Sequence, residues 1–265
     1  MKTYFVDSFT DQKYRGNPAA VCIVENTLDN QTMQNIAAEI GYSETAFVEK
    51  QIQGIFKIRF FTPKREIPLC GHATLASSKI IFDDSELSKI VFININGTEL
   101  IINKEHNKIV MEFPQYNLIE FNLPHEVADA LGIKKWEESK FCEETKMVLV
   151  EISSSEELSH LTPDYPTLVK SYENINGICV TPKSQVVNYD FQYRYFWPWA
   201  GSNEDPVTGA VQTFLTPYWA NKIGKQKMNA FQASERTGEM EILLKEGKVI
   251  IYGQAITTLE GDFKL

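Results

Sequence analysis

Apolar and aromatic residues gather in short stretches in the first half of the chain, a pattern typical of β-strands. Stretches rich in Val, Ile, Phe and Tyr and bounded by turn residues predict strands at 3–9, 19–24, 45–49, 56–62, 90–95, 99–103 and 109–113. Asn96-Gly97 between two of these strands is a strong hairpin signal. Apolar residues from Met33 to Ile40 follow helical spacing and Gly41 comes next, which predicts a helix that ends at this glycine.

The second half mixes strand patterns with helical ones. A stretch that contains Pro and Asn at 114–124 predicts a crossover between the two halves. After it, the pattern predicts helices at 125–131 and 207–223, a region of mixed charge at 134–146, and strands at 147–152, 177–181, 189–196, 239–244 and 249–252.

An internal repeat is the most informative pattern in the chain. The sequence RFFTP at 59–63 is echoed in the second half by RYFWP at 194–198. If the alignment continues without a gap, Cys70 falls on Asp205, and both stretches then enter a helical pattern. Upstream, 44–48 matches 176–180, so that Glu44 falls on Asn176. A chance echo of aromatic strand ends is the alternative, but a true duplication predicts two similar lobes with a ligand site in the cleft between them.

Composition and charge narrow the class of protein. The chain has 265 residues, of which 43% are hydrophobic and 23% charged, which is ordinary globular composition. The net charge of −9 argues against a partner such as nucleic acid or an anionic membrane. The cysteines have no CxxC spacing, no secretory signal precedes the first strand, and no apolar run is long enough to span a membrane. We therefore expect a cytoplasmic protein with a small-molecule substrate.

Two loop segments that precede helical patterns carry candidate binding groups. In LCGHAT at 69–74, Gly71 lets the backbone approach a ligand closely, and the free N–H groups of a helix start favour an anion. EDPVTGA at 204–210 has the same form in the second half. There, Asp205 suits a helix N-cap and Pro206 the first turn, so capping alone would explain the aspartate. Capping and ligand contact are compatible.

Cys70 and His72 suggest a nucleophile and its base. Residues two positions apart need not face each other, however, and the sequence shows no partner that would orient the histidine. A zinc site is also disfavoured, because no second pair of ligands has metal spacing. The chain has no P-loop, no GxGxxG after a strand and no HExxH, so we expect neither a cofactor nor a metal.

Glu44 begins a predicted strand among mostly apolar residues. Desolvation there would raise the pKa of its carboxyl group toward the range useful for proton transfer at neutral pH. A solvated glutamate at a strand end is the alternative. The aligned Asn176 cannot titrate, so the two lobes would be chemically unequal.

Six motifs together resemble those of the PhzF-like family, the phenazine-biosynthesis-like isomerases and epimerases. They are Asp7-Ser8-Phe9, RGNPAAV at 15–21, SETAF at 43–47, 59–66, CGHAT at 70–74 and EDPVTG at 204–209. The resemblance implies an α/β (α+β) fold of the diaminopimelate-epimerase type. This fold has two pseudo-symmetric lobes, each a curled mixed sheet around a central helix. The first lobe would comprise residues 1–114 and 254–265, the second 115–253, and a homodimer is expected.

The resemblance also implies roles for single residues. Glu44 matches the glutamate that transfers the proton. His72 and Asp205 match residues that line the site, where they would bind the substrate or help to protonate it. Gly71 and Gly209 match the glycines at the two helix starts. We expect Asn17, Cys70, Thr208 and Ala210 to contact the substrate as well. Because Asp205 stands where related epimerases have their second cysteine, a two-cysteine racemase is disfavoured.

One position departs from the family pattern. The family often has a serine followed by Ala-His after the Thr-Gly pair, whereas this chain has Ala210-Val211-Gln212. Our leading hypothesis is a cofactor-independent isomerase that moves a proton within a small carboxylate-bearing metabolite. The alternatives are an amino-acid epimerase that uses Glu44 with Cys70, and a catalytically silent metabolite-binding protein on the same fold, which Ala210 favours.

Overall fold

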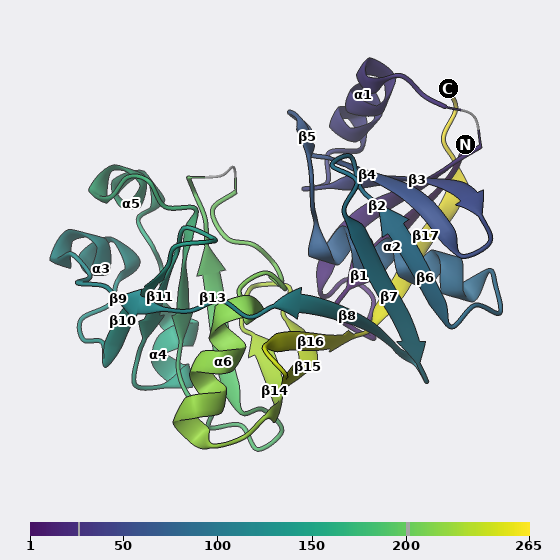
Figure 1. The fold of residues 1–265 in the computed structure, drawn as a ribbon. Helices are drawn as coiled ribbons and strands as arrows, with labels where there is room; N and C mark the ends of the chain where they lie inside the picture. The colour runs from purple at the N-terminus through teal and green to yellow at the C-terminus, as the bar shows by residue number, and fades with distance from the viewer. Residues whose placement is uncertain (26, 200–201) are drawn as a thin grey trace. The chain divides into compact units, whose positions relative to one another are not determined.

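The chain of this computed structural model divides into two units, Met1–Glu112 with Ile250–Leu265, and Phe113–Val249. The structure describes residues 1–25, 27–199 and 202–265 (Figure 1). Within these residues, no helix combines the length and the apolar character needed to cross a membrane.

The first unit is built on a mixed sheet. Its elements are β1 (Lys2–Ser8), β2 (Asn17–Val24), α1 (Asn30–Ile40), β3 (Thr45–Ile52), β4 (Ile55–Phe61), β5 (Glu66–Ile67), α2 (Gly71–Asp83), β6 (Lys89–Ile93), β7 (Glu99–Glu105), β8 (Lys108–Pro114) and β17 (Ala255–Asp262). Neighbouring strands follow the order β17-β1-β2-β3-β4-β6-β7-β8. The pairs β2–β3 and β4–β6 are parallel and the others antiparallel.

Helix α2 is the centre of this unit. It is buried on nearly every side, and it packs against β1, β2, β3 and β17. Its Ser77 and Ser78 hydroxyls donate to carbonyls of the preceding turn, which satisfies them without solvent. A Cβ on Gly253 would clash with Leu75 of this helix, so the chain there approaches α2 too closely for a larger residue. This packing fixes the position of the helix start at Gly71.

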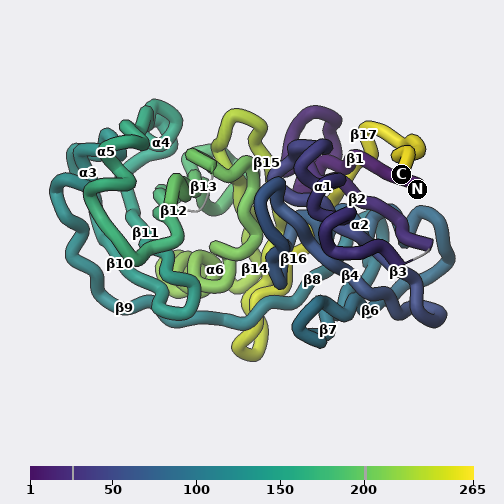
Figure 2. The backbone as a smooth tube through the Cα atoms, turned by 90° about the horizontal axis from the view of Figure 1, so that it is seen from above, coloured from purple at the N-terminus to yellow at the C-terminus, as the bar shows by residue number. Residues whose placement is uncertain are grey.

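The two chain ends lie side by side in the first unit (Figures 1 and 2). β17 pairs antiparallel with β1, and the amino group of Met1 donates to the carbonyl oxygen of Phe263 at 3.0 Å. The last strand of the chain therefore completes the sheet that the first strand begins.

The second unit has its own mixed sheet and more helices. Its elements are β9 (Ile119–Glu120), α3 (His125–Leu131), β10 (Glu138–Cys142), β11 (Met147–Glu151), α4 (Ser155–His160), α5 (Tyr165–Ser171), β12 (Gly177–Thr181), β13 (Phe191–Phe196), α6 (Gln212–Ile223), β14 (Lys227–Gln232) and β15 (Gly238–Lys245), while β16 (Lys248–Gly253) crosses the boundary between the units. The strand order is β9-β10-β11-β12-β13-β14-β15, with parallel pairs β11–β12 and β13–β14. Helix α6 is buried like α2, and its Trp219 stacks on Phe191 with the ring centroids 5.7 Å apart.

Both units contain the same core motif. In each, an antiparallel pair of strands (β3–β4 or β12–β13) has a parallel neighbour on either side, and the buried helix connects the second strand of the pair to its parallel neighbour. The repeated arginines lie at matching places. Arg59 forms a two-fold hydrogen bond to Glu66, and Arg194 forms the same contact to Glu204. The predicted fold class, with two similar lobes that each hold a mixed sheet and a central helix, is confirmed.

Several predicted elements need correction. The helix predicted at 207–223 begins only at Gln212, and 207–211 form a non-helical loop. Asp205 is therefore not the N-cap of this helix; Val211 takes that place and has no capping side chain. The region of mixed charge at 134–146 contains strand β10, and β14, α4 and α5 were not predicted.

Candidate active site

Glu44 sits where the chain enters the sheet of the first unit. The left-handed Gly41 ends α1, and Glu44 comes immediately before β3. Its carbonyl oxygen accepts a hydrogen bond from the backbone N–H of Ala20 at 3.3 Å, which ties it to β2. Only 5% of the residue is exposed, so Glu44 is not the solvated glutamate of the alternative hypothesis.

Cys70 and His72 stand at the start of the central helix α2. Cys70 is the N-cap residue, and its carbonyl oxygen accepts hydrogen bonds from both the N–H and the hydroxyl of Thr74. The carbonyl oxygen of His72 accepts a hydrogen bond from the hydroxyl of Ser8 at 2.8 Å, which links the helix start to β1. Thr74 of the same helix thus holds the backbone of Cys70, and Ser8 of β1 holds the backbone of His72.

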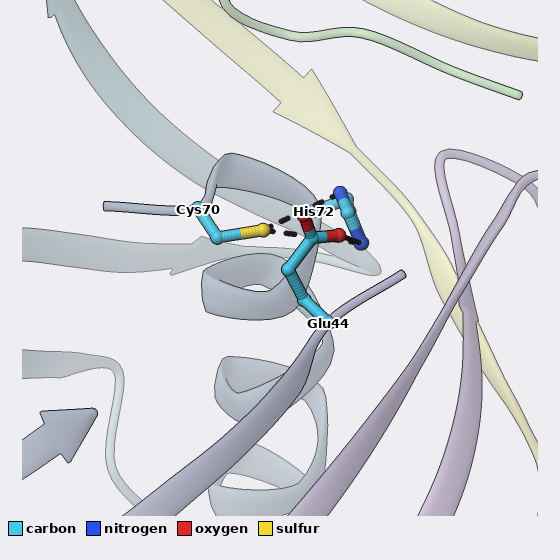
Figure 3. A group of neighbouring side chains, drawn as sticks. All are labelled: Glu44, Cys70 and His72. Atoms are coloured by element: carbon cyan, nitrogen blue, oxygen red, sulfur yellow. Dashed lines mark hydrogen bonds and ion pairs between the residues drawn. The ribbon is translucent and has the colours of Figure 1, made fainter. Parts of the chain in front are cut away.

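The three side chains meet in one buried cluster (Figure 3). His72 Nε2 lies 3.2 Å from Glu44 Oε2, and Cys70 Sγ lies 3.5 Å from His72 Nδ1. One ligand-type atom from each residue falls within 4.8 Å of the other two. The partner that orients the imidazole, which the sequence did not show, is therefore Glu44.

The cluster sets the ionisation of its own members. Burial by itself would raise the pKa of Glu44, but the hydrogen bond and charge of His72 outweigh it and lower that pKa below its usual 4.5. The expectation of a raised pKa for Glu44 was wrong because it counted desolvation alone. Burial opposes a charge on His72, yet contacts with Cys70 and Glu44 hold its pKa well above 6.5. Burial raises the pKa of the Cys70 thiol. Contacts within the cluster therefore favour the charged forms of Glu44 and His72, whereas burial favours the neutral form of the Cys70 thiol.

Two further predicted residues lie close to this cluster in the fold. Gly71 is the first residue of α2, between Cys70 and His72. Asn17 is fully buried at the start of β2, where it pairs in register with Ser8, the residue that holds the His72 carbonyl group. The structure therefore brings Asn17, Glu44, Cys70, Gly71 and His72 into one region of the first unit.

The remaining predicted residues lie in the loop before α6 of the second unit. Asp205 and Thr208 are buried, and the Thr208 hydroxyl donates to Asp205 Oδ2 at 2.5 Å. The side chain of Gln232 fixes this loop from β14: its amide group donates to the Asp205 carbonyl oxygen and accepts from the Thr208 N–H, both at 2.6 Å. No sequence motif pointed to Gln232, because a lone glutamine in a strand carries no local signal.

Gly209 and Ala210 form the turn that leads into α6. The carbonyl oxygen of Gly209 accepts from the N–H of Gln212, and that of Ala210 accepts from the N–H and the hydroxyl of Thr213. Gly209 thus stands before the helix rather than in it, unlike Gly71 at the start of α2. The side chain of Ala210 is exposed and has no hydroxyl group to offer.

Comparison with known proteins identifies the family of the chain. A family model described as phenazine biosynthesis-like protein (PhzC-PhzF) matches residues 6–261. The chain belongs to this family. Among its relatives, phenazine biosynthesis-like domain-containing protein 2 of Mus musculus is 40% identical over 97% of both chains. An uncharacterized isomerase of Halalkalibacterium halodurans is 39% identical over 99% of this chain and 98% of its own.

Solved structures agree with this assignment. A PhzC/PhzF phenazine biosynthesis protein from Clostridium difficile superposes with a TM-score of 0.91 at 38% identity, and all of both chains is covered. A hydroxyproline epimerase from Agrobacterium vitis has a TM-score of 0.58 at 8% identity over 98% of this chain and 91% of its own, a likeness that concerns the fold alone. The PhzC-PhzF chain thus shares its fold with epimerases and its sequence with proteins named as isomerases.

Proposed function

We propose that the protein is a cofactor-independent isomerase in which Glu44 removes a proton from one carbon of a small carboxylate-bearing metabolite and returns it to another. The observation that carries this proposal is the buried contact of 3.2 Å between Glu44 Oε2 and His72 Nε2. Membership of a family whose relatives are named isomerases supports the reaction class.

The pair supplies the two states that a proton shift requires. A general base must be ionised before it accepts a proton, and the neighbouring imidazolium keeps Glu44 in that form. After the transfer, Glu44 holds the proton as a neutral carboxylic acid and donates it to another carbon of the substrate. His72 can donate a hydrogen bond to negative charge that develops on the substrate, because its raised pKa favours the protonated form.

Substrate binding is assigned to the groups around the two central helices. The first N–H groups of α2, from Gly71 onward, have no partner within the helix and favour an anion such as a carboxylate. In a chain with a net charge of −9, such local donors are needed to hold an anionic ligand. We assign Asn17, Asp205, Thr208, Gly209 and Ala210 to substrate contacts of the same reaction.

Hydrogen exchange tests this function without knowledge of the substrate. The protein is incubated in deuterated water with a panel of small carboxylates, including amino acids and unsaturated acids, and carbon-bound hydrogens are followed by proton NMR. We expect one class of compound to lose signal at a carbon next to a carbonyl group or double bond. Exchange in no compound, combined with specific binding of one, would instead establish a metabolite-binding protein.

A second candidate function is amino-acid epimerisation by Glu44 together with Cys70. The contact of 3.5 Å between Cys70 Sγ and His72 Nδ1 favours it, because a thiol beside an imidazole can deliver a proton. Circular dichroism of the substrate separates the two reactions. Loss of the circular dichroism signal would show inversion at a stereocentre. A new absorption band from a shifted double bond would show isomerisation.

A further inference from the structure

A cavity of about 570 Å³ lies beside the last turn of helix α2 in the first unit. Its apolar wall is formed by Ile23 of β2, Val48 of β3, Phe56 of β4, and Ile80 and Ile81 of α2. None of the residues assigned to the proposed reaction lines this cavity. We propose that the cavity binds an apolar amino acid as a zwitterion, with the side chain of the ligand against the apolar wall.

The register of the sheet builds the apolar wall. Ile23 pairs with Val48 in the parallel ladder β2–β3, and Phe56 lies opposite Lys50 in the antiparallel ladder β3–β4. Val48 and Lys50 are two residues apart on one strand, so their side chains lie on the same face of the sheet. The ring of Phe56 packs against the buried Phe92, with the centroids 6.0 Å apart. The wall is therefore continuous with the core of the unit, and its position is fixed by the core.

The loop after α2 and the β3–β4 hairpin also border the cavity, and hydrogen bonds fix both. The Ser85 hydroxyl donates to the Ile81 carbonyl oxygen at 2.6 Å and accepts from the N–H of Leu87 at 3.4 Å. The Gly54 carbonyl oxygen accepts from the N–H of Val91 at 2.9 Å, which ties the hairpin to β6. A preformed, largely apolar cavity of this volume is typical of a small-molecule site.

The rim of the cavity carries unpaired charges of both signs. Lys50, Asp84 and Glu86 border the cavity and are exposed. Within the part of the chain that the structure describes, the charged groups of these three side chains have no ion-pair or hydrogen-bond partner. The charge of Asp84 acts on Lys2 and Tyr4 only through longer-range electrostatics. The rim can therefore accept both a cationic and an anionic group of a ligand.

The two carboxylates of the rim stand at an unfavourable place for negative charge. Helix α2 ends at Asp83, Asp84 is its C-cap residue, and no basic residue lies in its last turn. The C-terminal end of a helix carries a partial negative charge, which disfavours acidic side chains there and favours cations. Asp83 is paired with Lys79, but Asp84 and Glu86 have no such partner. The ammonium group of a ligand would supply the missing cation.

Charge complementarity selects a zwitterion over ligands with one charge. An amine without a carboxylate would leave Lys50 unpaired, and an apolar acid without an amine would leave the two carboxylates of the rim unpaired. An apolar amino acid places its ammonium group at Asp84 and Glu86, its carboxylate at Lys50 and its side chain on the wall. This inference does not depend on the proposed isomerase reaction.

NMR of the protein labelled at its isoleucine methyl groups tests the site, because Ile23, Ile80 and Ile81 line the cavity. Each signal is assigned by substituting the isoleucine with valine. Titration with L-phenylalanine should shift these three signals in a saturable way. Phenethylamine, which lacks the carboxylate, and 3-phenylpropionate, which lacks the ammonium group, should each bind at least about threefold more weakly.

Variants at the rim and the wall locate the ligand. We expect Lys50→Gln and Asp84→Asn each to weaken phenylalanine binding at least about threefold, and both positions are exposed, so the fold should tolerate the changes. Leu87→Trp should weaken binding at least about tenfold, because the indole ring of the variant would fill part of the cavity that Leu87 lines. Lys57→Gln is the matched control: Lys57 is an exposed lysine of β4 whose neighbour Phe56 faces the cavity, so Lys57 points to the opposite face of the sheet.

Three results would overturn the proposal. The first is the absence of a saturable shift at the three isoleucine signals. The second is binding of phenethylamine or 3-phenylpropionate as tight as that of phenylalanine, which would show that the ligand needs only one charge. The third is an equal loss of binding in Lys57→Gln and Lys50→Gln. Hydrogen exchange of the substrate is measured separately, so failure of the isomerase proposal would leave the binding result at this cavity unchanged.

Discussion

Glu44 and His72 belong to different elements, yet their side chains form an ion pair 3.2 Å apart. The sequence marked each of them as a candidate, one by its apolar neighbours and the other by the motif around it. It could not predict their contact, because that depends on how β2, β3 and the start of α2 pack. The same contact reversed the expected direction of the Glu44 pKa shift, since a buried partner charge outweighs burial.

Cys70 tests whether the thiol takes part in the chemistry. In the proposed reaction it transfers no proton, and a serine hydroxyl can keep its contact with His72. We expect Cys70→Ser to retain at least about a tenth of the wild-type rate, a loss in transition-state stabilisation below ~1.4 kcal/mol. The comparison is made by steady-state kinetics in metal-free buffer. A drop of several thousandfold would revive the cysteine mechanism.

At the scale of the elements, strands rich in β-branched and aromatic residues, and helix α1 with its glycine stop, were predicted to within a few residues. The start of α6 was not, because Asp205-Pro206 carries the local signals of a helix N-terminus. In the structure the Asp205 carboxylate accepts a hydrogen bond from Thr208, and Gln232 holds this loop through hydrogen bonds to the backbone of Asp205 and Thr208. Strand β10 was missed because it contains charged residues and no run of apolar ones. Tertiary contacts therefore determine both the start of α6 and the formation of β10.

The two repeated arginines should differ in their contribution to stability. Arg194 bonds Glu204 and also the carbonyl oxygens of Leu158 and Leu161, whereas Arg59 bonds Glu66 and the more exposed Asn30. We expect Arg194→Ala to lower the free energy of unfolding by about 2–4 kcal/mol and Arg59→Ala by about 1–2 kcal/mol.

Urea denaturation monitored by circular dichroism measures both losses. Lys2→Ala provides the control, because its ion pair with Glu260 is exposed and should contribute less than about 1 kcal/mol. An Arg59 variant that is less stable than the Arg194 variant would contradict this ranking.

For the molecule as a whole, a short echo in the sequence predicted two units with the same core topology. The echo revealed this topology because the repeated arginine and aromatic residues end the strand that leads, through a loop, to the central helix of each unit. The chemistry is not duplicated. Asn176, which aligns with Glu44, is exposed and donates to the Thr145 carbonyl oxygen. Among the described residues, the cluster of glutamate, cysteine and histidine therefore occurs in the first unit alone.

The cluster should give global stability a characteristic pH dependence. Because the folded pKa of Glu44 lies below 4.5, its contribution is complete above pH 4.5 and is lost as the pH falls through that folded value. Because the folded pKa of His72 lies above 6.5, its contribution to stability is complete below pH 6.5. This contribution is lost as the pH rises through the folded pKa. The stability difference between wild type and Glu44→Gln should be largest between pH 4.5 and 6.5.

Urea titrations at a series of pH values, in metal-free buffer, determine this difference. Glu49→Gln, a half-buried glutamate of the same strand β3, should show no such maximum. A difference between wild type and Glu44→Gln that stays constant across the whole pH range would mean that the two side chains do not form an ion pair in solution.

The central claim is that Glu44 carries the proton, and Glu44→Gln tests it most directly. Glutamine keeps the shape and most hydrogen bonds of the side chain but cannot accept a proton. The measurement is the rate of deuterium incorporation into the compound that the wild type exchanges, together with its binding affinity, with Glu49→Gln as the matched control. The account predicts a loss of about 10²–10⁴-fold in rate with little change in binding. A Glu44→Gln protein whose rate stays close to that of the wild type would contradict it.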